Sequence, residues 1–282
     1  MWPNTSQLTE RIEERIREWH VSVETTLETE SSFLAFGTCG DQAVVLKVLR
    51  APGDEWRVGE TLEAFDGAGT VRVHAHVPGA VLIERLHPGT SLVLLVLEGR
   101  DEEATEVIAD VIQRMSRARQ PSVPPATVED WGEGFQRYLA SRDTQVAIPL
   151  VKRAQQIYMD LCGSQRRTRL LHGDLHHDNV LFDADRGWVA IDPKGVVGEV
   201  EYEVGASLRN PVERPELFAS SQIVERRLEV YALRLQLDAD RALRWSFSQA
   251  VLSAIWSVED GVAVDAANPG LMLAHAIQPL LG

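Results

Sequence analysis

The residues best suited to chemistry lie in one short stretch, residues 172–179, and at Asp192, thirteen residues after its end. Asp174 can accept a hydrogen bond from a substrate hydroxyl and take its proton while a new bond to phosphorus forms. Asn179 and Asp192 offer a neutral and a charged oxygen to Mg²⁺, a hard cation commonly held by one or two carboxylates and phosphate oxygens. This pattern predicts phosphoryl transfer, with Asp174 as the catalytic aspartate and Asn179 and Asp192 as metal ligands.

Two short apolar runs, residues 179–183 and 188–192, lie on either side of the turn sequence 184–187. Their β-branched and aromatic side chains predict two strands of a hairpin. Antiparallel pairing places the start of one strand beside the end of its partner. We therefore expect Asn179 and Asp192 to lie close enough for a single ion to reach both.

The same stretch has two alternative interpretations. His172, His176 and His177 are ligand types that zinc accepts, and Asp and Asn are common in turns that carry no function. The histidine spacing suits one face of a helix, whereas Gly173 and the Asp-Asn pair at 178–179 favour a loop. Zinc is therefore the weaker alternative.

Lys47 lies in the apolar run 44–49, which predicts a buried strand. Burying an ammonium without an anionic partner is costly, so we expect either a functional lysine or an edge strand that turns Lys47 to solvent. In protein kinases a lysine in such a strand binds the ATP phosphates and precedes the aspartate motif, as it does here. Its carboxylate partner should lie on a helix predicted between residues 54 and 65, with Glu60 as first choice and Glu63 as second. A solvated helix face is the alternative for either one.

Other nucleotide contacts are less clearly indicated. The chain has no G-x-G-x-x-G loop, so Ser31 and Ser32 would have to bind phosphate with amides or hydroxyls. Residues 84–89 contain turn punctuation typical of a hinge between lobes. The main-chain groups of Glu84 and Leu86 are expected to bind the adenine edge.

Composition bounds the class of protein. The chain has 282 residues, 44% of them hydrophobic, and a formal net charge of -14, which predicts a soluble globular protein with a sizeable core. Nucleic acid and anionic membranes require an excess of Lys and Arg, so neither is an expected partner, whereas a cationic small molecule suits the acidic surface. The two cysteines have no C-x-x-C spacing and the longest apolar run, 92–97, cannot span a bilayer, so we expect a cytoplasmic protein. The expected oligomeric state is a monomer.

Hydrophobic periodicity divides the chain into a β-rich first part and a mostly helical second part. The hinge sequence places the boundary between residues 86 and 87. The expected strands are 44–49, 71–77 and 81–83, and the expected helices are 8–19, 54–65, one from the acidic residues 101–103 to Met115, 146–161, 222–236 and 241–258.

Four segments resemble the aminoglycoside phosphotransferase superfamily, in the branch of streptomycin 6-phosphotransferases and aminoglycoside/hydroxyurea resistance kinases. Residues 171–181 are shared with the wider superfamily, whereas 190–195, 207–211 and 248–257 point to this branch. The resemblance implies an α+β, protein-kinase-like bilobal fold. Residues 1–86 would form a nucleotide-binding lobe with a small antiparallel sheet, and residues 87–282 a larger, mostly helical catalytic and substrate-binding lobe.

The resemblance also implies the activity, which is transfer of the ATP γ-phosphate with Mg²⁺ to an antibiotic hydroxyl. Asp174 would be the catalytic aspartate, Asn179 and Asp192 the Mg²⁺ ligands, and Lys47 the phosphate-binding lysine. The expected acceptor is streptomycin, at the 6-hydroxyl of its streptidine ring.

Streptidine carries two guanidinium groups, which carboxylates bind with paired hydrogen bonds. A tryptophan can add a stacking face for such a cation. Glu203 stands where the branch is expected to have an aspartate, and its longer side chain moves the charge. The candidate substrate residues are Glu199, Glu201, Glu203, Glu259, Asp260 and Trp256.

Three other functions fit parts of the pattern. The same fold can phosphorylate another small molecule, such as hydroxyurea or a metabolite. The absence of a glycine-rich loop suits a non-catalytic, nucleotide-binding regulator, although the presence of Lys47, Asp174, Asn179 and Asp192 together argues against it. A metal-dependent hydrolase that uses the histidines is the most distant alternative.

Overall fold

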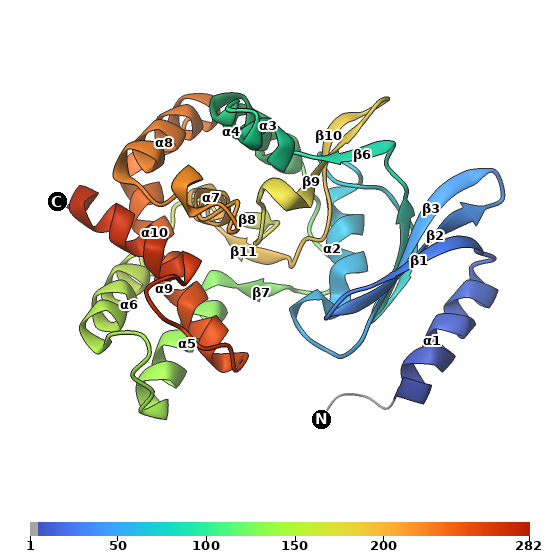
Figure 1. Ribbon diagram of the computed structural model, residues 1–282, viewed down its shortest axis with the longest axis horizontal. Coiled ribbons are helices and arrows are strands. Elements are labelled where there is room, and N and C mark those ends of the chain that lie inside the picture. Colours follow the sequence, from blue (N-terminus) through green and yellow to red (C-terminus); the bar gives the residue numbers. More distant parts are fainter. Residues whose placement is uncertain (1–4) are drawn as a thin grey trace.

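The computed structural model describes residues 5–282; residues 1–4, which the predicted N-terminal lobe includes, lie outside the described residues. Two lobes face each other (Figure 1), and the first is built on a five-stranded antiparallel sheet with the order β1-β2-β3-β5-β4. Its strands are β1 (Ser22–Glu28), β2 (Ser32–Cys39), β3 (Gln42–Leu49), β4 (Val73–Val77) and β5 (Ala80–Glu84).

The N-terminal sheet carries a helix on each face. On one face, α1 (Thr5–Glu18) packs its apolar stripe on Leu46 and neighbouring strand residues. On the other, the 3₁₀ turn η1 (Asp54–Arg57) leads into α2 (Val58–Phe65), whose Leu62 packs with Val45. Because side chains alternate along a strand, Lys47 shares the face of Val45 and points towards α2. Strand β3 lies between β2 and β5, so the edge-strand alternative for Lys47 is wrong.

The second lobe is mostly helical, and its core surrounds α9, a 21-residue helix with apolar side chains on nearly every side. The helices predicted in this lobe are present within one or two residues, whereas α3, α5, α7 and α10 were not predicted. The helices are α3 (Val93–Leu97), α4 (Asp101–Met115), α5 (Val128–Ser141), α6 (Ile148–Cys162), α7 (Val200–Leu208), α8 (Ser221–Leu235), α9 (Ala239–Glu259) and α10 (Pro269–Ile277), with 3₁₀ turns η2 (His177–Asn179), η3 (Pro215–Leu217) and η4 (Gln278–Leu280).

Two three-stranded sheets hold the polar loops of the C-terminal lobe. The predicted hairpin is present as β9 (Val180–Asp183) and β10 (Gly187–Ala190), and β6 (Pro88–Ser91) extends it. In the other sheet, β11 (Val196–Gly198) pairs with β8 (Arg169–Leu171) and β7 (Ala126–Thr127). Residues 172–179 therefore leave β8 and enter β9, and residues 191–195 leave β10 and enter β11, so strands anchor both ends of each polar segment.

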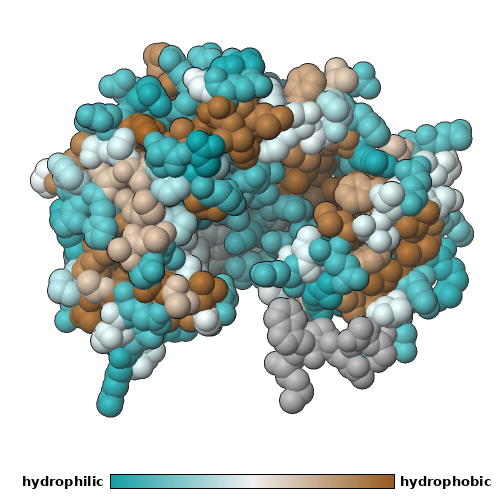
Figure 2. All heavy atoms as spheres, viewed as in Figure 1, coloured by the Kyte–Doolittle hydropathy of each residue, from teal (hydrophilic) through white to brown (hydrophobic). Residues whose placement is uncertain are grey.

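A hollow separates the two lobes, and both hydrophilic and hydrophobic residues border it (Figure 2). The last strand of the N-terminal sheet ends at Glu84, and the next strand, which belongs to the C-terminal lobe, begins at Pro88. The predicted boundary between residues 86 and 87 falls between these strands. Within residues 5–282, no helix combines the length and the apolar character needed to cross a membrane.

A buried arginine ties together the helices behind this hollow. Arg227 of α8 is 1% exposed and donates through Nε and Nη2 to both carboxylate oxygens of Asp101, at the start of α4. Its Nη1 donates to the carbonyls of Ser207 and Asn210 at 2.9 Å each. Burial would raise the pKa of Asp101, but Arg227 and the exposed Arg226 lower it below its ordinary value.

We expect Arg227→Met to destabilise the protein by about 3–5 kcal/mol, because it removes the buried donor of Asp101 and of several carbonyls. Arg226→Met is a matched control: it removes a half-exposed arginine from the same carboxylate and should cost less than about 1 kcal/mol. Urea unfolding of the purified variants measures both. Equal, small losses would contradict the role of Arg227.

Candidate active site

Lys47 joins the two lobes through a pair of carboxylates. Its Nζ lies 2.7 Å from Oε2 of Glu55 and 3.0 Å from Oδ1 of Asp192, which follows β10. Burial alone would lower the pKa of Lys47, but the two carboxylates outweigh it and raise the pKa above its ordinary value. The ammonium is therefore charged, and its two ion pairs link strand β3 to the turn η1 and to the C-terminal lobe.

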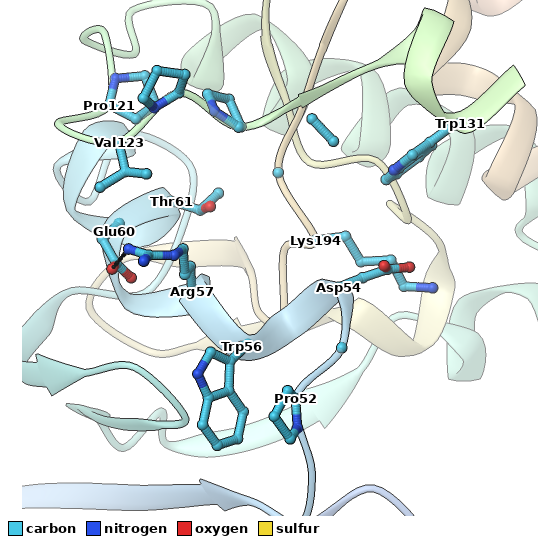
Figure 3. Close-up of a pocket in the computed structure, with 15 residues that line it drawn as sticks. Pro52, Asp54, Trp56, Arg57, Glu60, Thr61, Pro121, Val123, Trp131 and Lys194 are labelled. Atoms are coloured by element: carbon cyan, nitrogen blue, oxygen red, sulfur yellow. Dashed lines mark hydrogen bonds and ion pairs between the residues drawn. The ribbon is translucent and has the colours of Figure 1, made fainter. Parts of the chain in front are cut away.

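The predicted partners of Lys47 were wrong. Glu60 instead accepts a hydrogen bond from Nη1 of Arg57 at 3.0 Å (Figure 3), and Glu63 lies 3.5 Å from His76. The reason is local: the α-helix begins only at Val58, and the 3₁₀ turn before it carries Glu55 to Lys47. Helical periodicity extended over residues 54–65 cannot reveal that change of geometry.

A largely apolar cavity of about 350 Å³ reaches the Lys47–Asp192 pair. Aliphatic side chains from both lobes line it, together with Phe36, and the hinge residues Glu84 and Leu86 form one wall. Such a cavity suits a flat aromatic base with phosphates directed at the lysine. The adenine contacts of Glu84 and Leu86 stay a prediction that their position in this wall supports.

The predicted phosphate role of Ser32 is wrong in this structure. Its amide donates to Oγ1 of Thr29 at 2.9 Å, and its hydroxyl lies 3.0 Å from the same atom, so both groups serve the β1–β2 turn. Ser31 is exposed, and its carbonyl accepts from the amide of Arg50. Among the residues described, neither serine lines the apolar cavity.

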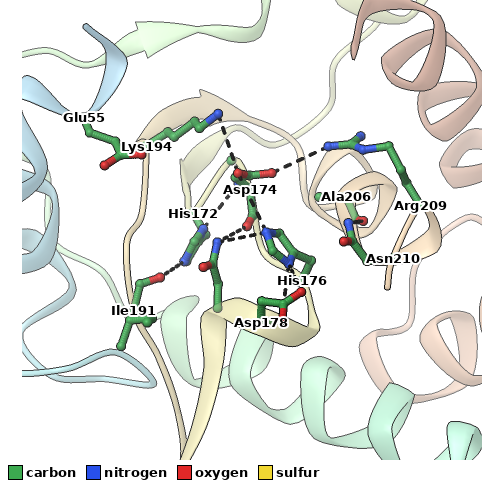
Figure 4. A network of polar contacts seen from close by, with 12 residues as sticks. Glu55, His172, Asp174, His176, Asp178, Ile191, Lys194, Ala206, Arg209 and Asn210 are labelled. Atoms are coloured by element: carbon green, nitrogen blue, oxygen red, sulfur yellow. Dashed lines mark hydrogen bonds and ion pairs between the residues drawn. The ribbon is translucent and has the colours of Figure 1, made fainter. Parts of the chain in front are cut away.

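Asp174 lies between two cations (Figure 4). Its Oδ2 is 3.6 Å from Nζ of Lys194, and its Oδ1 is 3.6 Å from Nη2 of Arg209. Burial would raise the pKa of Asp174, but the surrounding positive groups, Lys194 foremost, lower it to about 2. The carboxylate is therefore ionised at neutral pH, and it is partly exposed to the hollow between the lobes.

His172 braces the catalytic loop against the hairpin. Its Nδ1 accepts from the backbone amide of Asp174 at 3.3 Å, and its Nε2 lies 2.7 Å from the carbonyl of Ile191. Burial lowers the pKa of His172 to about 4, so the ring is neutral and can serve both contacts only as the Nε2–H tautomer. The ring thus fixes Asp174 relative to the residue before Asp192.

Glu203 holds the backbone of the same loop from the buried side. Its predicted contact with substrate was therefore wrong. Glu203 is 1% exposed, and its carboxylate accepts hydrogen bonds from the backbone amides of His172 at 2.6 Å and Gly173 at 3.0 Å. Burial raises the pKa of Glu203 to about 7, although these two hydrogen bonds oppose the shift. Glu203 therefore holds the loop and does not reach the hollow.

Asn179 and Asp192 are suited to hold a hard cation. Asn179 donates through Nδ2 to the carbonyl of Asp174 at 3.0 Å, which leaves its side-chain oxygen for an ion. Asp192 contacts Lys47 through Oδ1 and has φ of 55°, a left-handed conformation that is uncommon outside glycine. One carboxylate and one amide oxygen, completed by phosphate oxygens, are a common Mg²⁺ environment, so these residues fit the predicted ion.

The histidines have separate surroundings. Nε2 of His176 lies 3.2 Å from the side-chain nitrogen Nδ2 of Asn179. His177 is buried, and its ring nitrogens have no hydrogen-bond partner in the described part of the chain. Over residues 5–282, no three His, Cys, Asp or Glu side chains are arranged to hold a metal ion together. The structure gives the zinc alternative no support.

The acidic residues expected at the substrate have structural partners instead. Glu199 is 2% exposed and accepts from Nε of Arg241 and Nε1 of Trp245, so it holds α9. Glu201 accepts from the amide of Asp238, the N-cap of α9. The expectation for Glu199 was wrong because this residue is buried against α9. Glu201 is partly exposed, so its contact with substrate stays a prediction.

The end of α9 gives a more mixed result. Glu259 pairs with Arg137 at 2.9 Å, and Asp260 is an exposed residue at the helix C-terminus. Trp256 packs edge-on against Trp131, with ring centroids 5.6 Å apart. Trp256 therefore supports a neighbouring aromatic side chain, and its contact with substrate stays a prediction.

Sequence reasoning missed Glu55, Lys194 and Arg209, three charged residues at the centre. Lys194 and Arg209 lie in the segments 190–195 and 207–211, which carried the family resemblance without an assigned role. A basic residue in each of these segments, after the aspartate motif in the sequence, could have indicated a role for Lys194 and Arg209. Glu55 had no signal, since it differs from neighbouring acids only in the turn it occupies.

The buried Glu203 has a consequence for stability. Its folded pKa of about 7 exceeds the ordinary 4.5, so between these pH values the folded protein keeps a proton that the unfolded chain has released. Stability should therefore fall as pH rises from about 4.5 to 7, by about 3 kcal/mol from this group. In Glu203→Gln this component is absent, so the difference in urea midpoint between wild type and variant should change over pH 5–8. A constant difference would contradict the titration.

Comparison with solved structures supports the architecture. A thermostable mutant of aminoglycoside phosphotransferase APH(4)-Ia, in a ternary complex with ADP and hygromycin B, superposes with a TM-score of 0.68 at 17% identity, covering 96% of this chain and 98% of the other. Choline kinase LicA from Streptococcus pneumoniae has a TM-score of 0.65 at 13% identity, covering 97% and 99%. The predicted α+β, protein-kinase-like bilobal fold is confirmed.

Sequence comparison supplies the family. The streptomycin 3''-kinase of Klebsiella pneumoniae is 35% identical over 241 residues, covering 83% of this chain and 87% of the relative. The hydroxyurea phosphotransferase of Kitasatospora aureofaciens is 32% identical over 251 residues, covering 79% and 68%. The family described as aminoglycoside/hydroxyurea antibiotic resistance kinase matches residues 18–261. The chain therefore belongs to the aminoglycoside/hydroxyurea antibiotic resistance kinase family.

Proposed function

We propose that this protein transfers the γ-phosphate of ATP to a hydroxyl of streptomycin. The observation that carries the proposal is the arrangement of Asp174, an ionised carboxylate that is partly exposed to the hollow, near the Lys47–Asp192 pair. The apolar cavity that ends at Lys47 supports the nucleotide half of the reaction. Family membership supports an aminoglycoside or hydroxyurea acceptor.

In the proposed reaction the acceptor hydroxyl oxygen forms a bond to the γ-phosphorus while the bond to the leaving ADP oxygen breaks. Asp174 accepts the hydrogen bond of the hydroxyl and aligns its lone pair for in-line attack. Because the pKa of Asp174 is about 2, it is a weak base, and its main contribution is orientation. The hydroxyl proton leaves towards this carboxylate as the new bond forms.

The charge of the transferred group is met by residues of both lobes. Lys47 binds the phosphates, and Lys194, beside Asp174, faces the oxygens of the moving phosphoryl group. Asn179 and Asp192 would hold Mg²⁺, which offsets negative charge on the phosphates when bound. Positioning and charge neutralisation supply most of the rate enhancement in such a reaction.

Streptomycin is favoured as acceptor by several relatives. Proteins that carry its name include the 3''-kinase of Klebsiella pneumoniae at 35% identity and the 6-kinase of Streptomyces griseus at 27%. The higher identity favours the 3''-hydroxyl over the 6-hydroxyl expected from the sequence. Hydroxyurea is the second candidate, because a hydroxyurea phosphotransferase is 32% identical.

Mass spectrometry of streptomycin after incubation with the protein, Mg²⁺ and ATP should detect one added phosphate, and fragmentation locates the hydroxyl. Asp174→Asn should lower turnover by about two to four orders of magnitude, because the amide cannot accept the proton or orient the hydroxyl equally well. Asp178→Asn, a change at an exposed aspartate of the same loop, is the matched control and should stay near wild type.

Transfer by Asp174→Asn at the wild-type rate would exclude Asp174 from the reaction. Phosphate on hydroxyurea but not on streptomycin would favour the second candidate. If no acceptor, including these two, leads to any consumption of ATP, the interpretation as a non-catalytic, nucleotide-binding regulator is revived.

Glu55 is a further test of the nucleotide half. Glu55→Gln removes the charge that holds Lys47 at 2.7 Å, so kcat/KM for ATP should fall about ten-fold or more. Glu63→Gln, a change at an exposed acid on the following helix, should leave it unchanged. Equal values for the two variants would contradict the assignment of Glu55 as the partner of Lys47.

A further inference from the structure

A second cavity lies between the lobes, also of about 350 Å³. Within residues 5–282 it shares no lining residue with the apolar cavity at Lys47. The segment after β10 passes from one wall to the other: Ile191 and Asp192 line the apolar cavity, and Lys194 and Gly195 line the second. The two cavities are therefore neighbours, and only a few residues of one loop separate them.

The second cavity also reaches the catalytic carboxylate. Lys194, on its wall, places Nζ 3.6 Å from Oδ2 of Asp174. Trp131 forms another part of the wall (Figure 3). It packs on the loop that carries Asp174, because a Cβ added to Gly173 would lie 2.7 Å from the ring of Trp131. A molecule held between Trp131 and Lys194 would therefore lie beside Asp174.

The lining differs chemically from that of the nucleotide cavity. Besides prolines 121, 124 and 125, it contains Trp56 and Trp131 and the carboxylates of Asp54 and Glu60. Glu60 is 9% exposed, and its Oε2 is buried without a hydrogen-bond partner in the described chain, 3.9 Å from Nδ1 of His76. This oxygen therefore faces His76, which does not line the cavity, so a ligand in the cavity would have to bind Oε1.

The other oxygen of Glu60 already binds a guanidinium. Nη1 of Arg57 lies 3.0 Å from Oε1, and the arginine side chain is half-exposed at the edge of the cavity. Oε1 of Glu60 therefore accepts from a guanidinium that itself lines the cavity. A guanidinium of a ligand could use the same geometry in place of Arg57.

We propose that the second cavity is the acceptor site, in which Asp54 and Glu60 bind the guanidinium or ammonium groups of a polyhydroxylated cation and Trp131 contacts its ring. The inference rests on the proposed phosphotransferase function. It moves the cation-binding residues from the acidic run after residue 198 to the N-terminal lobe, so the acceptor contacts both lobes.

The positive charge of Lys194 is compatible with a cationic acceptor, because its ammonium lies at the inner end beside Asp174. There it faces the position of the moving phosphoryl group, and the acceptor presents a neutral hydroxyl. Trp131 is held in place by Trp256, at 5.6 Å between centroids, and by Tyr202 at 6.1 Å. The aromatic wall is therefore packed against two further rings, and Glu60 lies across the cavity from Trp131 (Figure 3).

The test compares Asp54→Asn and Glu60→Gln with Glu63→Gln, a change at an acid of the same helix outside the cavity. Each cavity variant should raise the KM for streptomycin about ten-fold, because a charge-assisted hydrogen bond is lost. The KM for ATP should stay within roughly two-fold, since the nucleotide cavity is separate. Glu63→Gln should change neither constant. Asp54 is exposed, so Asp54→Asn removes the charge without affecting the stability of the fold. A thermal melt checks that Glu60→Gln is folded.

Titration calorimetry of streptomycin with wild type and the same variants separates this inference from the proposed function. Binding that weakens about ten-fold in Asp54→Asn and Glu60→Gln supports the cavity even if no phosphate is transferred. That combination would refute the phosphotransferase activity alone. Wild-type affinity in both variants, or no streptomycin binding by the wild type, would overturn the acceptor site. A raised KM for ATP in place of streptomycin would also overturn it.

Discussion

The buried ammonium of Lys47 is the constraint on which the arrangement of the two lobes depends. It lies on a central strand of the N-terminal sheet and is 4% exposed, so its charge requires close anionic partners. One partner, Glu55, comes from the turn before α2, and the other, Asp192, from the C-terminal lobe. Because loss of either carboxylate would leave a buried charge unpaired, this triad fixes the helix, the sheet and the loop that carries Asp192 relative to one another.

The C-terminal lobe supplies the second fixed point by a different means. Glu203 uses both carboxylate oxygens to hold consecutive amides of the catalytic loop, and His172 bridges that loop to the hairpin. Strand pairing in β8 and β11 anchors the ends of the same segment. Asp174 is thus held by hydrogen bonds to its backbone, while its carboxylate lies 3.6 Å from Lys194 and Arg209 and 4.0 Å from His176. The hydroxyl of an acceptor could therefore donate a hydrogen bond to this carboxylate without breaking a strong contact.

The sequence predicted what depends on local pattern and order. The hairpin that brings Asn179 near Asp192 follows from two short apolar runs, and the expected function of Lys47 follows from its strand and its place before the aspartate motif. The roles of the acids could not be predicted, since periodicity says which residues share a helix but not what that helix faces. Glu203 looked like part of an acidic surface run, yet α7 is buried between the catalytic loop and α9. Glu55 depended on a 3₁₀ turn that no spacing rule distinguishes from a helix.

The distribution of charge reconciles an acidic protein with a polyanionic co-substrate. The net charge is -14, yet Lys47, Lys194 and Arg209 gather at the centre and can neutralise phosphates at contact distance. A net negative field attracts a cationic acceptor, but at physiological ionic strength it is screened beyond about 8 Å. Overall acidity can therefore speed encounter but cannot choose among cations or orient one of them. Under the proposed function, selection depends on carboxylates that contact the acceptor, so their position between the lobes matters more than their number on the surface.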